Sequence, residues 1–475
     1  MKKTFQNKRD EVEYLLKKQK IRSIEDLDSY KLSICHPNSA GIDIGSRDIY
    51  VALPPLRAAE LGISIVHRFA THTNDLIACK DLLIACGIDT VSMESTSVYW
   101  VTLYDILTQA DLEVCLVNPK KFRMVPGRKT DILDCQWLQT LHAYGLLRGS
   151  FHPDDNIRKL RTYMRHREKA IKEQGRFVQR MQKAMTQMNL LLHNVIDDIM
   201  GVTGLSIIQA ILAGERDPKK LAAYRHGRIK ATEQEIENSL QGYYQDEYIF
   251  LLKQNYESYK FFANQIEEID KQIEALLLTF PLKKEKIEQR PKNHKPRKMK
   301  SKNSLKTQTN LEDMLYGILG TDITSLPGFR GQAILQVISE VGYDMSKFPD
   351  EKHFASYLGF VPHNKITGGV IISSRTDRIK SSAAQAFRKI VPSISRSNTA
   401  LGAYYRRLAP RIGKGQAIVA TCRKLSMMFY RALKYGVEFV EQGSEQYKAQ
   451  QQEHKKKYLE KLAKELNMTV IPLAA

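Results

Sequence analysis

Apolar and polar residues alternate along the first part of the chain in the pattern of a strand-rich domain. The run AGIDIGSRDIYVALP, which starts at Ala40, places apolar residues in alternation on either side of Gly45-Ser46. Two short strands joined by a tight turn produce this pattern, and residues 63–70 fit a third strand. Helical and strand-like runs then follow in turn, at 75–86, 90–94, 98–110 and 112–117. Strands that alternate with helices predict an α/β sheet domain.

A helical periodicity replaces this alternation in the middle of the chain. Between 157 and 195 apolar residues recur every three or four positions, and only Arg167 and Gln174 break the spacing. A second series spans 249–277, with Asp270 as its one polar insertion. Both series predict long amphipathic helices of the coiled-coil type. An antiparallel hairpin within one chain and pairing between chains fit them equally well.

The other segments differ in glycine content and charge. Glycines punctuate residues 201–242, which predicts short helices there. Residues 283–306 hold eleven Lys or Arg and two Glu without apolar periodicity, which is typical of a disordered basic linker. Residues 311–436 are predicted to form a compact, mostly helical domain, and 443–468 a basic helical tail.

Charge narrows the choice of partners. The 475 residues include 73 Lys plus Arg and 52 Asp plus Glu, a formal charge of +21, while the 43% of apolar residues is ordinary for a globular chain. Because the basic residues run through several segments, nucleic acid fits better than a membrane surface. The six cysteines form no CxxC pair, and there is no signal-peptide core or long apolar stretch. These features predict a reduced, cytoplasmic protein without a zinc site, disulfides or a membrane span.

Four carboxylates in the predicted sheet domain are the first candidates for chemistry. Asp43 lies inside a strand, Glu94 ends another, and Asp131 and Asp134 share a face of the helix that Thr130 is placed to cap. An all-oxygen set suits Mg²⁺, and two such ions would serve a phosphoryl transfer. Singly, Asp131 and Glu94 are at least as well explained as helix caps, and Asp134 as a surface charge. A basic loop just before the helix favours the metal site, and its cations are Lys120, Lys121, Arg123, Arg128 and Lys129.

A Pro-Gly-x-x-Gly turn opens the run LPGFRGQAILQVISEVG, residues 326–342. The turn contains Gly328, Arg330 and Gly331 and leads into an amphipathic helix. Backbone N–H groups at such a helix start bind phosphate, as in half of a helix-hairpin-helix element that grips the DNA backbone. The same turn also occurs for purely structural reasons.

A second turn lies within residues 358–390, where Thr367 precedes Gly368 and Gly369. The glycines would let a phosphate approach the backbone closely. Its neighbouring cations are Arg375, Arg378, Lys380 and Arg388. On composition alone, a hairpin turn with solvated basic flanks is the better interpretation.

Together these motifs resemble a known family. The segments AGIDIGSRDIYVAL, MESTSVYW, VNPKKFRMVPGRKTDILDCQWL, LPGFRGQAIL and FASYLGFVPHNKITGG follow one another in the order found in DEDD-type insertion-sequence transposases. These are bridge-RNA-guided recombinases, related to the Piv-like DNA invertases. The similarity spans about residues 40–436.

The resemblance implies a RuvC-like, RNase H-type first domain whose metal-binding acids are Asp43, Glu94, Asp131 and Asp134. It implies a coiled-coil middle that assembles subunits, and a mostly α C-terminal transposase domain with a nucleophilic serine that joins DNA covalently. The acids and the serine would come from different subunits. The expected parts are an N-terminal extension (1–37), the RuvC-like domain (38–153), the coiled-coil region (154–282), a basic linker (283–308), the transposase domain (309–440) and a basic tail (441–475).

One position departs from the family pattern, because Thr367 stands where the family has serine before two glycines. Threonine keeps the hydroxyl but adds a methyl group that restricts χ1. Thr367 is the expected nucleophile; the alternatives are Ser373, Ser374 or an impaired copy.

The resulting hypothesis is a Mg²⁺-dependent DNA transposase or site-specific recombinase of bacterial or archaeal cytoplasm, associated with the nucleoid. Its expected partners are DNA, a structured guide RNA and further copies of itself, as a dimer or tetramer. Two alternatives remain open: a metal-dependent nuclease or junction resolvase that uses water, and a non-catalytic nucleic-acid-binding protein.

Overall fold

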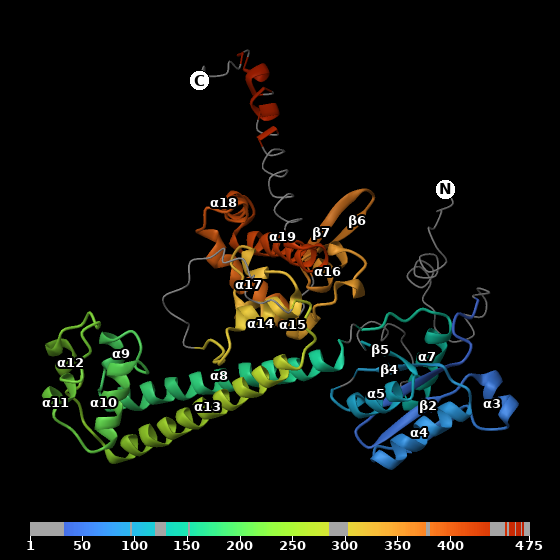
Figure 1. Ribbon diagram of the computed structural model, residues 1–475, viewed down its shortest axis with the longest axis horizontal. Coiled ribbons are helices and arrows are strands. Elements are labelled where there is room, and N and C mark those ends of the chain that lie inside the picture. Colours follow the sequence, from blue (N-terminus) through green and yellow to red (C-terminus); the bar gives the residue numbers. More distant parts are fainter. Residues whose placement is uncertain are drawn as a thin grey trace. The chain divides into compact units, whose positions relative to one another are not determined.

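A computed structural model divides the chain into two compact units, residues 1–152 and 153–475 (Figure 1). It describes residues 33–95, 97–118, 130–150, 153–284, 303–376, 381–437 and, in the tail, 452–453, 456–460, 462–466 and 468–469. Most of the predicted N-terminal extension and of the basic tail therefore lies outside the described residues. No helix in the described ranges is long and apolar enough to cross a membrane.

The first unit is built on a five-stranded mixed sheet in the order β3-β2-β1-β4-β5. Its strands are β1 (Ser39–Ile44), β2 (Asp48–Ala52), β3 (Val66–Ala70), β4 (Thr90–Glu94) and β5 (Glu113–Val117). The first three pair antiparallel in chain order, whereas β4 pairs parallel with both β1 and β5. Its helices are α3 (Pro55–Leu61), α4 (Thr73–Ala85), α5 (Trp100–Gln109) and α7 (Asp131–Ala143). The predicted mixed α/β domain is confirmed.

The tight turn predicted between β1 and β2 is present, since the N–H of Gly45 donates to the carbonyl of Asp48 at 2.9 Å. The prediction of a strand over 63–70 is wrong at its start, because β3 begins at Val66 and helix α3 precedes it. Pro55 in the first turn of α3 and Gly62 in the left-handed conformation at its end (φ 64°) are the local signals for this short helix.

One face of the sheet packs against α4 and α5. Ile42 of β1 and Met93 of β4 are fully buried and share a core with Leu83 of α4 and Leu107 of α5. Side chains alternate along a strand, so the residues on either side of Ile42 and Met93 point to the opposite face. That opposite face carries the candidate acids.

The second unit begins with two long helices side by side, α8 (Asp155–Gln187) and α13 (Asp246–Leu278) (Figure 1). Arg167 of α8 pairs with Asp270 of α13, and further along α8 the Phe177 ring stacks on Phe262 at 5.6 Å. The helices therefore run antiparallel, and of the two pairings open to the sequence the structure shows the one within a single chain.

α8 ends at Gln187, so the prediction of one helix up to 195 is wrong there. Asn189 has a left-handed backbone conformation (φ 57°), and the carbonyl of Met188 accepts the N–H of Tyr243 at 2.9 Å. These two features turn the chain out of the helix. The glycine-rich stretch holds short helices as predicted, and the elements between the arms of the hairpin are α9 (Leu192–Val195), α10 (Val202–Leu212), α11 (Pro218–Ala222) and α12 (Glu233–Ser239).

Arg167 and Asp270, the polar interruptions of the two helical patterns, are each other's partners. Arg167 Nε donates to Asp270 Oδ1 at 2.5 Å, and the two side chains are 3% and 1% exposed. Asp270 also accepts the backbone N–H of Lys306 at 2.9 Å, while Arg167 donates to the carbonyl of Asn303 at 3.2 Å. Both buried charges are thus paired and further hydrogen-bonded, as a low-dielectric interior requires.

We expect Asp270→Ala to lower the free energy of unfolding of the second unit by about 3–5 kcal/mol, because it leaves the Arg167 guanidinium buried without a counter-charge. Chemical denaturation of the full chain measures the loss. In the matched control, Glu267→Ala, removal of the exposed pair with Lys306 costs less than about 1 kcal/mol. Equal losses in the two variants would contradict a buried pair.

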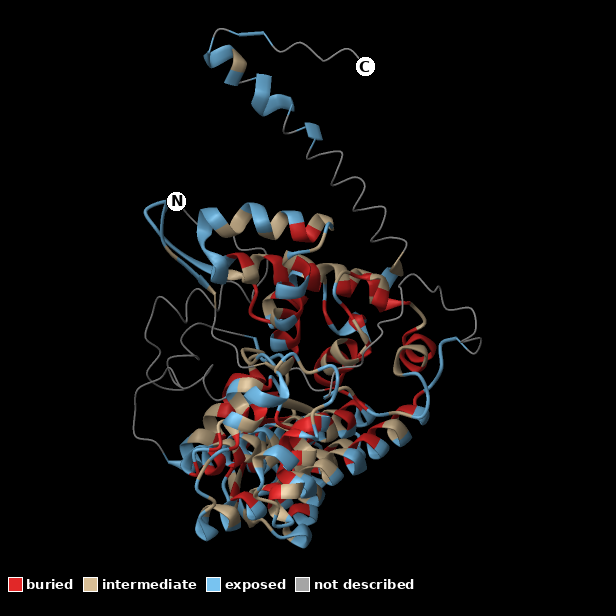
Figure 2. Cartoon of the chain, turned by 90° about the vertical axis from the view of Figure 1, so that its left-hand side faces the viewer, coloured by how far each residue is buried: buried red, intermediate tan, exposed pale blue. Residues whose placement is uncertain are grey.

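The last region is mostly helical, as predicted. Its elements are α14 (Leu311–Leu319), η2 (Ile323–Ser325), α15 (Gly331–Val341), η3 (Met345–Lys347), α16 (Glu351–Tyr357), β6 (Pro362–Thr367), β7 (Val370–Thr376), α17 (Ser382–Ser395), α18 (Ala400–Ile412) and α19 (Lys414–Tyr435). Buried aromatic rings form its core, with Phe329 against Phe387 and Phe429. Figure 2 shows the buried positions gathered on the inner sides of these helices.

Both ends of the predicted disordered linker 283–306 are packed, so that prediction is wrong at its boundaries. The N–H of Lys283 donates to the carbonyl of Gly317 at 2.9 Å. Leu305 is 5% exposed, and its N–H donates to Gln332 at 3.1 Å. Composition alone concealed these contacts, because they join residues far apart in the chain. Residues 285–302 lie outside the described ranges.

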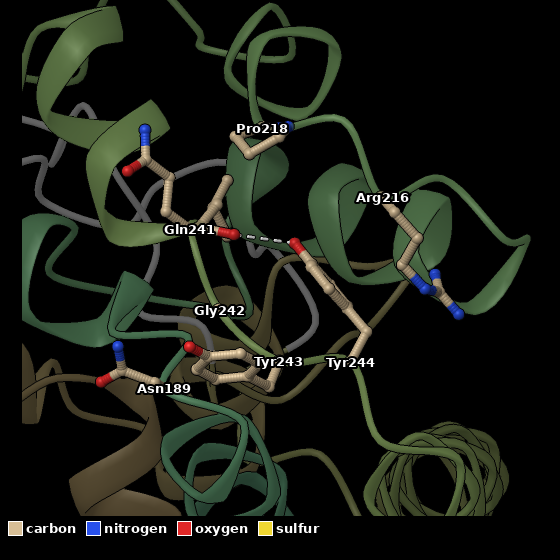
Figure 3. Close-up of a pocket in the computed structure, with 8 residues that line it drawn as sticks. Asn189, Arg216, Pro218, Gln241, Gly242, Tyr243 and Tyr244 are labelled. Atoms are coloured by element: carbon tan, nitrogen blue, oxygen red, sulfur yellow. Dashed lines mark hydrogen bonds between the residues drawn. The ribbon is translucent and has the colours of Figure 1, made fainter.

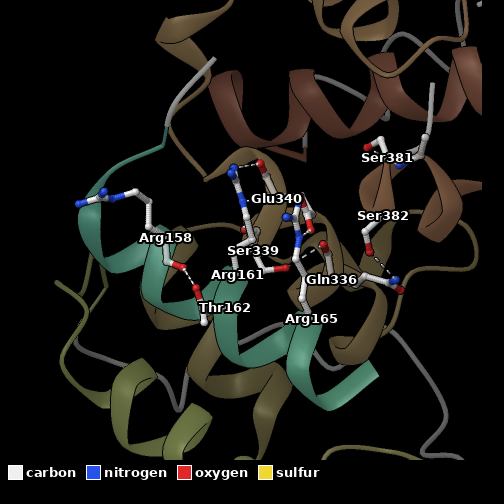
Figure 4. A network of polar contacts seen from close by, with 10 residues as sticks. Arg158, Arg161, Thr162, Arg165, Gln336, Ser339, Glu340, Ser381 and Ser382 are labelled. Carbon is white, nitrogen blue, oxygen red and sulfur yellow. Dashed lines mark hydrogen bonds and ion pairs between the residues drawn. The ribbon is translucent and has the colours of Figure 1, made fainter. Parts of the chain in front are cut away.

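A polar network fixes α8 to α15 (Figure 4). The guanidinium of Arg165 donates two hydrogen bonds to Glu340, both at 2.8 Å, and Arg161 donates to the Glu340 carbonyl at 2.6 Å. One turn earlier on α15, Gln336 donates to the hydroxyl of Ser382 on α17 at 3.1 Å. Specific hydrogen bonds therefore attach the last region to the helical hairpin.

Candidate active site

Helix α7 lies directly on the sheet face opposite α4 and α5. A Cβ atom at Gly41 of β1 would lie 2.3 Å from both the Cys135 carbonyl oxygen and the Gln139 nitrogen, so only glycine allows this approach. On β4, the hydroxyl of Ser92 donates to the carbonyl of Leu138 at 3.1 Å. Two small residues on neighbouring strands thus bring the α7 backbone close to the sheet.

The two strand acids lie on this same face. Asp43 is two residues beyond Gly41, and Glu94 is two residues beyond Ser92, so each shares the side of the strand that faces α7. β1 and β4 are parallel, and their register pairs Ile42 with Met93. Asp43 and Glu94 therefore lie next to each other on adjacent strands. Glu94 is 6% exposed, and Asp43 is half-buried.

The acids of α7 lie near the same ends of β1 and β4 as Asp43 and Glu94, because α7 runs antiparallel to these strands. His142 of α7 lies 2.8 Å from the hydroxyl of Thr90, and Leu138, four residues earlier in α7, contacts Ser92, two residues later in β4. Four residues of the helix therefore cover the same distance as two residues of the strand. Four residues of helix rise about 6 Å and two of strand about 7 Å. The next step along both elements places Asp134 level with Glu94.

The Cys135 thiol gives an independent sign of this arrangement. Burial and, next to it, the negative charges of Asp43 and Asp134 together raise the pKa of Cys135 to about 12. Both carboxylates are therefore close to one buried thiol. The structure brings the strand acids close to the start of α7, although Asp43 and Asp134 are 91 residues apart in the sequence.

The start and end of α7 are both held in place. The N–H of Leu133 donates to the Thr130 hydroxyl at 3.3 Å, which confirms the predicted cap and leaves Asp131 exposed in the first turn. Near the other end, burial and then the charge of His36 lower the pKa of His142 to about 4, so this ring is neutral at pH 7 when it meets Thr90. The helix is thereby fixed in register against the sheet.

The carboxylates offer the oxygen ligands that Mg²⁺ prefers. As their side chains stand, no three His, Cys, Asp or Glu residues of the described ranges lie close enough together to hold an ion. The donor chemistry of Asp43, Glu94, Asp131 and Asp134 fits a metal, and their assignment as ligands stays a prediction. The cations predicted beside them, Lys120, Lys121, Arg123, Arg128 and Lys129, lie outside the described residues.

Gly41 and Ser92 are the site residues that sequence reasoning missed. Each precedes a strand acid by two positions, and its small side chain admits the α7 backbone that carries the other acids. The available signal in the sequence was a small residue two positions before an acid, repeated on two predicted strands. The role of the small residues becomes clear only with α7, a helix that begins about 40 residues after the second strand.

Thr367 lies at the tip of an exposed two-stranded hairpin formed by β6 and β7. Gly368 and Gly369 form its two-residue turn, and both have positive φ (57° and 82°), as a type I′ turn requires. The hairpin predicted from composition is confirmed, and its residues are exposed or half-exposed throughout. The hydroxyl of Thr367 is thus presented on a solvent-exposed ribbon.

The alternative serines occupy different places on the hairpin. Ser373 pairs with Lys365, and Ser374 pairs with Asn364, to whose side chain its hydroxyl donates at 2.9 Å. Both therefore lie away from the glycine turn that distinguishes Thr367. Of the nearby cations, Arg375 is exposed on β7, Arg388 lies over the Phe360 ring at 5.7 Å, and Arg378 and Lys380 fall outside the described residues.

The predicted phosphate turn before α15 is packed into the protein. The N–H of Gly331 donates to the Glu312 carboxylate at 3.3 Å, so an acid already occupies this helix start. A Cβ at Gly328 would lie 2.6 Å from Ile390, and Phe329 is buried in the aromatic core. Arg330 remains half-buried beside the turn. A structural role explains these contacts, and phosphate binding by Gly328, Arg330 and Gly331 stays a prediction.

A pocket of about 570 Å³ opens at the end of the helical hairpin, distant in sequence from the acids (Figure 3). Arg216 lies over the Tyr244 ring at 5.0 Å, and the Tyr244 hydroxyl donates to the Leu240 carbonyl at 2.9 Å. Asn189, Gln241 and Tyr243 complete its polar lining. The lining contains no carboxylate and no histidine, so it offers neither metal ligands nor a general base.

Comparison with known families agrees with the two candidate regions. Residues 40–190 match a family of transposases, the DEDD enzymes of the IS110 type, and residues 321–406 match the Transposase IS116/IS110/IS902 family. None of the curated proteins compared with the chain matches it. The first match contains all four acids, and the second contains the hairpin with Thr367.

These two matches, in this order along one chain, show that it belongs to the DEDD-type insertion-sequence transposases. The family is RuvC-like, and its members are DNA-cutting enzymes that generally depend on a divalent metal ion. The mixed sheet of the first unit and the helical second unit agree with that membership.

Proposed function

We propose that the protein is a Mg²⁺-dependent recombinase of an insertion sequence, which cuts and exchanges DNA strands through a hydroxyl nucleophile and with a guide RNA. The observation that carries the proposal is the convergence of the β1 and β4 acids with the first turns of α7 on one sheet face. We infer that carboxylates gathered there serve phosphoryl transfer, and membership of the DEDD transposases supports this.

Mg²⁺ bound by Asp43, Glu94, Asp131 and Asp134 would supply Lewis-acid stabilisation of the charge that develops on the reacting phosphate. The other groups of the site have separate tasks. Gly41 and Ser92 hold α7 against the sheet, and Thr130 fixes where its first turn begins. Their role is to keep four carboxylates oriented before the substrate arrives.

Thr367 would act as the nucleophile. Its hydroxyl oxygen forms a bond to the DNA phosphorus and loses its proton, while the bond from phosphorus to one deoxyribose oxygen breaks and that oxygen leaves as a hydroxyl. The bond energy is retained in the protein–DNA diester, so rejoining to a second strand needs no ATP. Its place on the exposed ribbon suits delivery to acids of another subunit, and we propose a dimer or tetramer on this ground.

The test is an analysis of the DNA products. The full-length protein, expressed together with the DNA that flanks its gene, is incubated with a plasmid carrying that DNA. We expect joined recombinant strands, their loss in EDTA, and their loss after RNase treatment. Free ends without joined products would instead identify a nuclease or resolvase that uses water, and joined products that resist RNase would remove the guide RNA from the proposal.

A further inference from the structure

The solvent face of α8 carries an unbalanced row of positive charge. The helix contains ten Lys or Arg and three acids. Five exposed cations recur at intervals of three, four, four and three residues, and we call them the α8 stripe: Lys169, Lys172, Arg176, Arg180 and Lys183. This spacing keeps them on one side of the helix over about 21 Å.

Neighbouring acids neutralise only part of the stripe. Lys172 is 3.5 Å from Glu168, and Arg176 pairs with Glu173. Across the described ranges, Lys169, Arg180 and Lys183 form no ion pair. Arg180 lies over the Phe177 ring at 5.0 Å, which orients its guanidinium without removing its charge.

The partner helix does not balance the stripe either. α13 has the opposite composition, with seven acids and three lysines, yet its buried acid Asp270 is already engaged by Arg167. Charge is therefore segregated between the two arms of the hairpin. The hairpin also makes the stripe rigid, because α8 packs along α13 and is fixed at Arg161 and Arg165 to α15.

The side chains on the surface of α8 indicate which kind of ligand the α8 stripe binds. None of the exposed large apolar side chains in the described ranges lies on α8, whereas a membrane-surface helix needs an apolar face to insert. The stripe also lacks an exposed aromatic side chain on which unpaired bases would stack. A straight row of long, positively charged side chains on a rigid helix instead suits the regularly spaced phosphates of a duplex. DNA is the duplex that a transposase acts on.

We propose that the α8 stripe is a sequence-independent binding surface for the backbone of duplex DNA, separate from the residues of the chemical step. Each Lys or Arg that meets a phosphate releases a counterion, so the stripe contributes to affinity and to its salt dependence but reads no bases. This inference depends on membership of the transposase family and on neither Thr367 nor a guide RNA.

The experiment compares two charge-matched variants of the full-length protein. Lys169→Gln/Arg180→Gln/Lys183→Gln removes three cations from α8, and Lys253→Gln/Lys260→Gln/Lys271→Gln removes three exposed cations from α13. Fluorescence anisotropy with a 40-bp duplex of mixed sequence measures affinity at several salt concentrations. For the α8 variant we expect at least a tenfold loss at 0.15 M salt, and a salt slope smaller by about 2.7, or about 0.9 per phosphate.

The α13 variant should keep the parental affinity and slope. Equal losses in the two variants would overturn the proposal, because net charge alone would then explain binding. A loss confined to a 40-bp RNA duplex would overturn it as well. Binding is measured without Mg²⁺ and without RNA, so the outcome is independent of the proposed chemistry. Thermal unfolding confirms that both triple variants are folded.

Discussion

Asp43→Asn is expected to reduce DNA strand cleavage by about 10³-fold or more while the first unit stays folded. The substitution keeps the size of the side chain and removes the negative charge that the proposed site uses to hold a cation. Asp43 shares its sheet face with Glu94 and the start of α7, where the proposed cation would lie. The measurement is the initial rate of plasmid cleavage in Mg²⁺, with circular dichroism to verify folding.

Asp48→Asn is the matched control. Asp48 lies on β2, the neighbouring strand, where it forms a partly exposed pair with Arg68 at 2.9 Å. The same chemical change there is expected to leave cleavage within about twofold of the parent, since exposed ion pairs contribute little. If Asp43→Asn cuts DNA at the parental rate, the acids of this sheet face are structural and the metal proposal fails.

Local sequence patterns predict the elements of the sheet unit well. The alternation around Gly45-Ser46 indicates β1 and β2, and a cap at Thr130 indicates where α7 begins. The physical reason is that a strand or a helix cap is decided by residues a few positions apart. Helix α3 was missed although its signals are also local, namely a proline and a glycine at its two ends.

Contacts between distant residues escape such patterns. Arg167 and Asp270 each interrupt a helical pattern, and only the hairpin shows that the two interruptions are one ion pair. Likewise Leu305 is buried at the end of a segment whose composition is typical of disorder. In the site, the acids could be selected by residue type, whereas the approach of α7 at Gly41 required the packed fold.

Thr367→Val is expected to abolish the covalent protein–DNA adduct, because valine keeps the branched shape at the hairpin tip but has no oxygen to bond to phosphorus. Thr367→Ser is expected to form the adduct faster than the parent, since it keeps the hydroxyl and removes the methyl group that restricts χ1. Denaturing gels of protein trapped on end-labelled DNA measure both, and each substitution leaves the Gly368-Gly369 turn unchanged.

Ser373→Ala and Ser374→Ala distinguish the hydroxyls of the hairpin. Both serines lie on β7 away from the turn, and the Ser374 hydroxyl already donates to Asn364, so neither variant should lose the adduct. An adduct that persists in Thr367→Val and disappears in one of these variants would transfer the nucleophile to that serine. Cleavage that continues in all three variants without any adduct would instead make water the nucleophile and the enzyme a nuclease.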